Sequence, residues 1–430
     1  MTAEIAVMNR EAIALAADSA VTMHDEHGEK VFLTANKIFA LSKREPVAAM
    51  IYGGAAMMGV PWEPAIKVFR QELGDTALPT VRKYAERLLR FLETHRGFFP
   101  DEQSEHFYRD HVAMILYFMR QTIEERKRRR TNATETESPD PEDVKVIIAV
   151  YRRFWRRAPY IPRTGPRFLA HVKQKSGQAI DQLVKQIFDG VKLAKAMVRD
   201  LSEICALSLV KCPLNFTWPS ATGLVIAGFG TKELFPSMIA YTLHGIFHKR
   251  LHHRRDLMES MDGNTSASIV PFAQSEMVYA FMEGVDPTYQ CEIEEDMSML
   301  LSKYPGLVLD SCKFLRKADR DRIKAEFQST ARDIAKQYKA GLEEYRNKHF
   351  ARPVVRLVSM LPKSELGPLA ESMVNLTSLR RRISMEAETV GGPIDVAMIS
   401  KGDGLIWIKR KHYFDPALNN QFFANYYRVQ

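Results

Sequence analysis

Alternating apolar and polar positions open the chain, a pattern typical of β-strands. It predicts short strands over residues 5–8 and 12–17, joined by a turn, and a second pair over 37–41 and 47–52. Two glycines end the last of these strands, and apolar residues then recur at helical spacing. The first part of the chain therefore predicts a group of strands followed by helices.

Long, basic helices are predicted for the next part of the chain, residues 96–213. Within this block, residues 179–209 have the apolar spacing of one long amphipathic helix. The polar stretch 131–143 predicts an exposed or disordered loop. Residues 291–362 form a second charged helical block, so two helical segments interrupt the strands.

Strand signals return between and after these blocks, over residues 224–227, 237–242, 394–399 and 405–409. The last two strands flank a Gly-Asp-Gly turn, which predicts a hairpin, and helices are expected at 276–282 and 365–382. One sheet-based α+β domain with two helical insertions is the simplest explanation of this order. The sheet-based domain then takes residues 1–95, 214–290 and 363–430, and the insertions take 96–213 and 291–362.

The composition is that of an ordinary globular protein, with 46% apolar and 26% charged residues. No run of eighteen uncharged apolar residues predicts a membrane span, and the N-terminus has no pattern of a secretory signal. The four cysteines are far apart and lack CxxC spacing, which argues against a zinc knuckle or a disulfide framework. A reduced, cytoplasmic location is therefore expected.

Two features raise the question of an anionic or metallic partner. The net charge is +9, and basic runs occur at 126–130 and 151–157, but Glu124 and Glu125 adjoin the first run and no nucleic-acid motif is present. We therefore favour solvated helix faces over a nucleic-acid site. His244, His248 and His252 have a spacing that would align three imidazoles on a helix for a metal, but lysines and arginines lie between them. A basic turn or an anion-binding patch is favoured there, and no metal or cofactor is predicted.

Thr2 follows the initiator methionine and is small enough for that methionine to be removed. The free α-amine would then lie on the residue that carries the hydroxyl. An α-amine titrates at roughly 7.7–8.0, so it could accept the hydroxyl proton near neutral pH. Thr2 thus has the two groups of the threonine variant of nucleophilic catalysis.

Two charged residues follow at strand ends. Asp18 comes sixteen positions after Thr2 and closes the second predicted strand, while Lys37 opens the third. In this order of strands and charges the chain resembles the proteasome β-subunit family of N-terminal-nucleophile hydrolases, above all its bacterial relative that works with an ATPase ring. The resemblance covers residues 2–95, 221–290 and 363–409. It implies a four-layer αββα sandwich, with Thr2 as nucleophile, Lys37 keeping its groups basic and Asp18 holding Lys37.

The same resemblance implies further site residues. A backbone oxyanion hole is expected near Met50 and Gly53, where Met50 replaces the family's usual glycine. The residues expected to line the adjacent substrate pocket are Val21, Ala48 and Tyr52. Supporting polar groups are expected at Ser275, the serine near the family's serine-bearing segment, and at Glu388, which stands in place of its aspartate. Ala273 and Gly391 occupy positions where the family has serines.

The expected function is hydrolysis of peptide or amide bonds in a peptide or protein substrate, by a homo-oligomer. The chain has no phosphate loop of Walker type, so any energy-dependent unfolding would come from a separate ATPase. Two alternatives remain open at this point. One is a catalytically inactive relative serving as a scaffold or in assembly, and the other is a nucleic-acid-binding protein that uses the basic helices.

Overall fold

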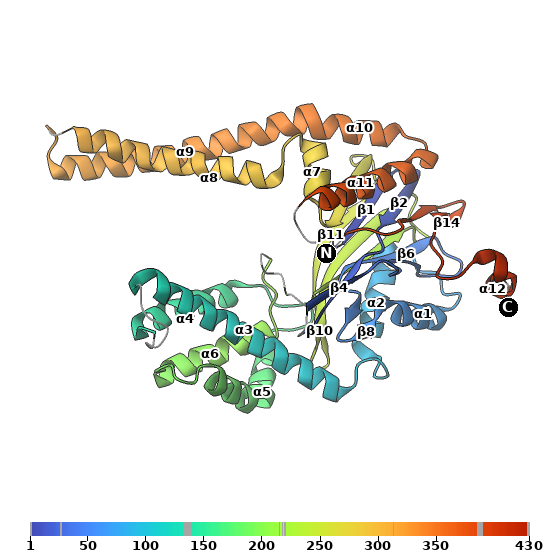
Figure 1. The fold of residues 1–430 in the computed structure, drawn as a ribbon, viewed down its shortest axis with the longest axis horizontal. Helices are drawn as coiled ribbons and strands as arrows, with labels where there is room; N and C mark the ends of the chain where they lie inside the picture. The colour runs from blue at the N-terminus through green and yellow to red at the C-terminus, as the bar shows by residue number, and fades with distance from the viewer. Residues whose placement is uncertain are drawn as a thin grey trace. The chain divides into compact units, whose positions relative to one another are not determined.

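The computed structural model describes residues 2–25, 28–131, 139–214, 216, 218, 221–312, 314–384 and 390–427. The chain divides into two compact units (Figure 1). The first comprises Met1–Ile38, Leu234–Pro236 and Ser260–Gln430, and the second comprises Phe39–Glu233 and Ser237–Glu259. Each unit has a five-stranded sheet, so the α+β class predicted from the sequence is confirmed.

The sheet of the first unit joins strands from both ends of the chain. Its order is β12-β1-β2-β13-β14, and every neighbouring pair is antiparallel. The strands are β1 (Ala3–Asn9), β2 (Ala12–Ala17), β12 (Ala267–Ala273), β13 (Asp395–Ser400) and β14 (Gly404–Lys409). A separate hairpin follows β2 and consists of β3 (Val21–Asp25) and β4 (Gly28–Phe32).

Helices pack on one face of this sheet. Ile5 and Val7 of β1 and the alternate alanines of β2 point towards α10 (Arg352–Met360) and α11 (Lys363–Ile383), where they form an apolar core. The intervening residues of β1 point to the other face because side chains alternate along a strand. That second face is also buried, as Ala6 and Met8 show. The strands β1 and β2 are therefore buried on both faces.

The predicted second helical block belongs to the first unit. After α7 (Glu276–Glu283), the long helices α8 (Pro287–Ser311) and α9 (Lys317–Arg346) run side by side (Figure 1). A π-helical turn, η1 (Asn347–Ala351), leads into α10, and the C-terminal part contains η2 (Pro416–Leu418) and α12 (Asn420–Tyr427). None of the helices in the described ranges is long and apolar enough to cross a membrane.

The second unit has its own sheet, in the order β11-β10-β9-β6-β5. The strands are β5 (Ile38–Ala40), β6 (Val47–Gly53), β9 (Thr222–Gly228), β10 (Ser237–Phe247) and β11 (Arg250–Ser260). Helices α1 (Trp62–Leu73) and α2 (Val81–Thr94) pack their apolar sides on one face of it, after a two-strand ribbon of β7 (Ala56–Met57) and β8 (Val60–Pro61). The basic turn predicted around the histidines is shorter than expected, because most of this segment belongs to β10 and β11. Only His248 and Lys249, both with positive φ, form the turn between two strands.

Four helices of the second unit form a bundle with a separate apolar core. They are α3 (Asp101–Thr131), α4 (Pro141–Arg157), α5 (Pro166–Ile187) and α6 (Lys195–Ser208). The single helix predicted over 179–209 is wrong, because the chain turns at Gly190 (φ 79°) between α5 and α6. The loop predicted at 131–143 is shorter, since α4 already begins at Pro141. Residues 132–138 of that loop lie outside the described residues.

Candidate active site

Thr2 lies immediately before β1 in the first unit, and its side chain is 2% exposed. Its carbonyl oxygen accepts a hydrogen bond from the Gln274 N–H at 3.2 Å, which continues the pairing of β1 with β12. Its hydroxyl Oγ1 donates to Oε2 of Glu4 at 3.1 Å. Positions two apart on a strand share a face, so β1 places this hydroxyl and carboxylate together.

Asp18 reaches the same place from the end of β2. The register pairs Glu4 with Ala17, so the next residue lies beside the start of β1. One carboxylate oxygen of Asp18, Oδ1, accepts from the Ala3 N–H at 3.2 Å, and the other, Oδ2, accepts from the Gly391 N–H at 2.9 Å. Backbone donors therefore hold this fully buried carboxylate in one orientation.

Lys37 supplies the positive charge of the cluster. It immediately precedes β5, is buried, and its Nζ forms an ion pair with Oδ1 of Asp18. The same Nζ lies 3.0 Å from Oε1 of Glu4. One ammonium thus lies between two buried carboxylates, and the hydroxyl of Thr2 is bonded to one of them.

The protonation of Glu4 follows from this arrangement. Burial raises the pKa of Glu4 to about 7, with Lys37 opposing the shift and the negative charge of Asp18 adding to it. A carboxyl group with a pKa near neutrality can both accept and release a proton under ordinary conditions. The structure therefore places a titrating group within hydrogen-bond reach of the candidate nucleophile.

Glu4 should make the stability of the fold depend on pH. Its folded pKa of about 7 lies above the ordinary value of 4.5, so the folded state keeps the proton to higher pH than the unfolded chain does. The resulting stabilisation is full below pH 4.5 and is lost as the pH rises through 7, by up to about 3 kcal/mol. Glu4→Gln cannot titrate, so we expect it to gain stability relative to the wild type across this window. Denaturant unfolding of both proteins from pH 4.5 to 8 measures the difference, and parallel curves would contradict the assignment.

A glycine loop closes the cluster on the side of β13. The Ser19 N–H donates to the Gly391 carbonyl at 3.1 Å, and the Ser19 hydroxyl donates to the Pro393 carbonyl. Gly392 has φ +80°, and a Cβ there would lie 3.0 Å from Leu33, so this position requires glycine. Gly391 stands where the proteasome β-subunit family, which the chain resembles, has a serine. Its backbone N–H donates a hydrogen bond to Asp18.

A second buried ion pair lies next to this loop. Asp395 begins β13, is paired in register with Ala17, and its Oδ2 forms an ion pair with Nζ of Lys411. Burial lowers the pKa of Lys411, which the Asp395 carboxylate partly opposes. The negative charge of Asp18 and the positive charge of Lys37 also act on Lys411, so the two ion pairs belong to one electrostatic group.

The structure thus brings together Thr2, Asp18 and Lys37 from the residues predicted for catalysis. Ser275 lies one residue beyond Gln274, at the start of α7, and is partly exposed. Within the described ranges, no hydrogen bond joins its side chain to the cluster around Thr2. Glu388 lies outside the described residues.

The residues expected for substrate binding occupy both units. Val21 begins β3 in the first unit, whereas the others, Ala48, Met50, Tyr52 and Gly53, lie on β6 in the second. Ala48 and Met50 are fully buried and lie outside the apolar core that their neighbours on β6 form with α1 and α2. They therefore point to the opposite face of that sheet. The Tyr52 ring lies across Gly223 of β9, where no side chain would fit.

Sequence reasoning missed Glu4, Asp395 and Lys411. One signal was available for Glu4, which is the only charged residue in the otherwise apolar strand Ala-Glu-Ile-Ala-Val-Met. A charge on a buried strand requires a partner. The pair of Asp395 and Lys411 had no such local signal, because it depends on the pairing of β13 with β2.

No protein-family model matches the chain, and no curated protein matches it.

Proposed function

We propose that the chain is a threonine-type N-terminal-nucleophile hydrolase that cleaves peptide or amide bonds through Thr2. One observation carries the proposal, namely that the Thr2 hydroxyl, the Lys37 ammonium and the carboxylates of Glu4 and Asp18 meet in one buried cluster. Strands β1 and β2 and the start of β5 bring these groups together from positions 2 to 37. A strand-end ion pair with a purely structural role would not need a nucleophile beside it.

In the proposed reaction, Oγ1 of Thr2 attacks the carbonyl carbon of the scissile amide. The hydroxyl proton passes to the α-amine that removal of Met1 would expose. The C–N bond then breaks, the leaving amine takes that proton, and an acyl ester remains on Thr2. Water attacks the ester and gives a proton to the α-amine, the acyl C–O bond breaks, and the α-amine passes that proton to Oγ1 of Thr2 as the carboxylic acid leaves. The positive charge of Lys37 disfavours protonation of the amine and so keeps it basic.

Glu4 adds a second proton acceptor to this scheme. While Met1 is present, the nitrogen of Thr2 belongs to a peptide bond and cannot serve as a base. The Glu4 carboxylate already accepts the hydrogen bond of the Thr2 hydroxyl at 3.1 Å. Glu4 therefore orients the nucleophile, and its pKa near 7 suits proton transfer around neutral pH.

The proposal also includes a specific arrangement of the sheets and helices. A four-layer αββα sandwich would bury the second face of each sheet, and that face is apolar and buried at Ala6 and Met8 on one sheet and at Ala48 and Met50 on the other. Assembly as a homo-oligomer, a separate ATPase partner and a cytoplasmic location complete the proposal. Assembly and the ATPase partner follow from the family resemblance, and the location follows from the cysteine usage and the N-terminal pattern.

An inactive scaffold is the second candidate, and the burial of Thr2 together with glycine at position 391 favours it. The nucleic-acid alternative loses support, because Arg152 and Arg156 of the basic segment form ion pairs with Asp200 and Glu203. Their charge is therefore largely neutralised within the unit.

A covalent probe separates the enzyme from the scaffold. Intact-mass measurement should show that the mature protein lacks Met1. A peptide epoxyketone or β-lactone should then add one probe mass to the wild type and to Thr2→Ser, which keeps both the hydroxyl and the amine. Thr2→Ala should not be labelled. Retention of Met1, or equal labelling of Thr2→Ala, would remove the catalytic proposal in this form.

A further inference from the structure

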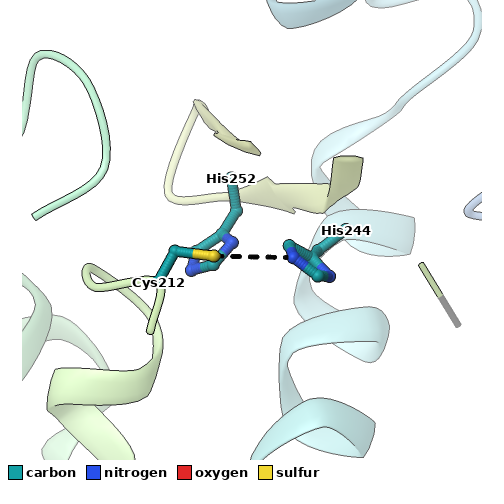
Figure 2. A group of neighbouring side chains, drawn as sticks. All are labelled: Cys212, His244 and His252. Carbon is teal, nitrogen blue, oxygen red and sulfur yellow. Dashed lines mark hydrogen bonds between the residues drawn. The ribbon is translucent and has the colours of Figure 1, made fainter. Parts of the chain in front are cut away.

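A cluster of one cysteine and two histidines lies in the second unit, apart from the groups proposed for catalysis. Cys212 follows α6, with its N–H bonded to the Pro159 carbonyl, whereas His244 lies on β10 and His252 on β11. All three side chains are buried, with exposed fractions of 3%, 1% and 0%. Figure 2 shows the thiol and both imidazoles turned towards one another.

The distances within the cluster fit a tetrahedral metal centre. Sγ of Cys212 lies 3.7 Å from Nε2 of His244, and one donor atom from each of the three residues lies within 4.8 Å of the others. Zinc bonds of about 2.3 Å to sulfur and 2.0–2.1 Å to nitrogen separate tetrahedral S and N ligands by roughly 3.6 Å. The side chains therefore need to move little to bind one ion.

The hydrogen bonds of His252 prepare it as a ligand. Its Nε2 lies 3.0 Å from the Lys211 carbonyl oxygen, which can only accept, so Nε2 carries the proton. The lone pair is then on Nδ1, which is buried and has no hydrogen-bond partner among the described residues. A ligating histidine commonly donates its other N–H to a backbone carbonyl in this way. Nδ1 of His244 is also buried and has no hydrogen-bond partner among the residues that the structure describes.

The surroundings of the cluster are buried and do not oppose a cation. The ring of Trp218 lies 5.5 Å from that of His244. Three of the neighbouring basic residues lie within ion-pair distance of a carboxylate in the unit, Lys249 of Asp101, Arg250 of Glu93 and Arg254 of Asp256. These carboxylates offset part of the interleaved positive charge that argued against a metal in the sequence.

We propose that Cys212, His244 and His252 bind one Zn²⁺ ion, with the fourth position left for water. The Cys212 thiol would lose its proton to solvent when the ion binds, because thiolate is the ligand form. The ion would tie the end of α6 to the adjacent strands β10 and β11, and so anchor the helical bundle on the sheet of the same unit. This role is structural and does not depend on catalysis by Thr2.

Metal analysis of the full-length protein tests the site directly. After purification without chelators, the wild type should contain one zinc per chain by elemental mass spectrometry, and Thr2→Ala should contain the same amount. Cys212→Ser and His252→Asn should lose the zinc. Cys205→Ser is the matched control, since Cys205 is also buried, lies on α6 and is outside the cluster, so this variant should keep it.

Cobalt spectroscopy decides the question without relying on variants that could misfold. Metal-free wild type titrated with Co²⁺ should develop a thiolate-to-cobalt charge-transfer band together with the visible bands of tetrahedral Co²⁺. Chelation should lower the melting temperature of the wild type and of Cys205→Ser but not of Cys212→Ser. A wild type that takes up neither Zn²⁺ nor Co²⁺ with a thiolate band would overturn the proposal and leave an apolar, hydrogen-bonded cluster.

Discussion

Replacing Thr2 with alanine should lower the rate of amide hydrolysis by at least about 10⁴-fold, because the acyl ester of the proposed reaction forms on the Thr2 hydroxyl. The substitution removes one hydroxyl and one methyl group from a buried position. It leaves the ion pairs of Lys37 with Asp18 and Glu4 in place. The loss of activity should therefore occur in a protein that is still folded. Turnover of a panel of fluorogenic peptides with different residues before the scissile bond measures it.

Thr2→Ser is the matched control for this experiment. Serine retains the hydroxyl and, after removal of Met1, the α-amine, so measurable turnover and acyl-ester formation should remain. Circular dichroism and melting curves of both variants should match those of the wild type. If the wild type hydrolyses peptides and Thr2→Ala does so equally fast, the nucleophile lies elsewhere. If none of the three is active or labelled, the scaffold alternative is favoured.

Replacing Lys37 with methionine should destabilise the fold by roughly 3–5 kcal/mol near pH 8. The lysine is 3% exposed and is the cation between the buried carboxylates of Glu4 and Asp18. Methionine has a similar length but no charge, so two carboxylates would remain buried close together without compensation. Protonation relieves this repulsion, so the defect should shrink as the pH falls towards 5. Denaturant unfolding of wild type and variant at pH 5 and pH 8 measures both effects.

Lys67→Met is the control for this prediction. Lys67 also has a carboxylate partner, Glu63, but both side chains are exposed, so its loss should change stability by less than about 1 kcal/mol at either pH. Equal effects of the two substitutions would mean that the charge of Lys37 does not hold the cluster together. Lys37→Met should also abolish any hydrolysis, because Lys37 is the cation proposed to keep the amine of Thr2 basic.

Local patterns predicted eight of the strands in the described ranges, but not β3, β4, β7, β8, β11 or β12. They also pointed to three residues of the candidate site. Period-two alternation located β1 and β2, and helical spacing located α11. The helical signal is strong because burial of one face repeats every 3.6 residues in a helix, whereas β1 and β2 are buried on both faces and also stood out as short apolar runs that end at polar residues. Asp18 and Lys37 were recognisable as charges at strand ends, where a buried sheet would otherwise continue with apolar residues.

Two expectations from the sequence differ from the structure because residue spacing does not show where the chain turns. His244 and His252 are eight positions apart, which matches two turns of a helix, yet they lie on neighbouring strands joined by a two-residue turn. The continuous amphipathic spacing over 179–209 likewise concealed the break between α5 and α6. A turn of a few residues changes the direction of the chain without disturbing the count of apolar positions.

The sequence by itself determined the α+β class, the two helical blocks and the order and spacing of Thr2, Asp18 and Lys37 near the start of the chain. These features depend on neighbours within about one element, where side-chain period and chain direction decide position. Only the tertiary structure decided that Glu4 binds the Thr2 hydroxyl and that the Gly391 N–H holds Asp18. It also decided that Cys212 meets two histidines more than thirty positions away. Each of these contacts depends on strand register and on packing between distant segments, because distance in space is set there by the fold and not by separation along the chain.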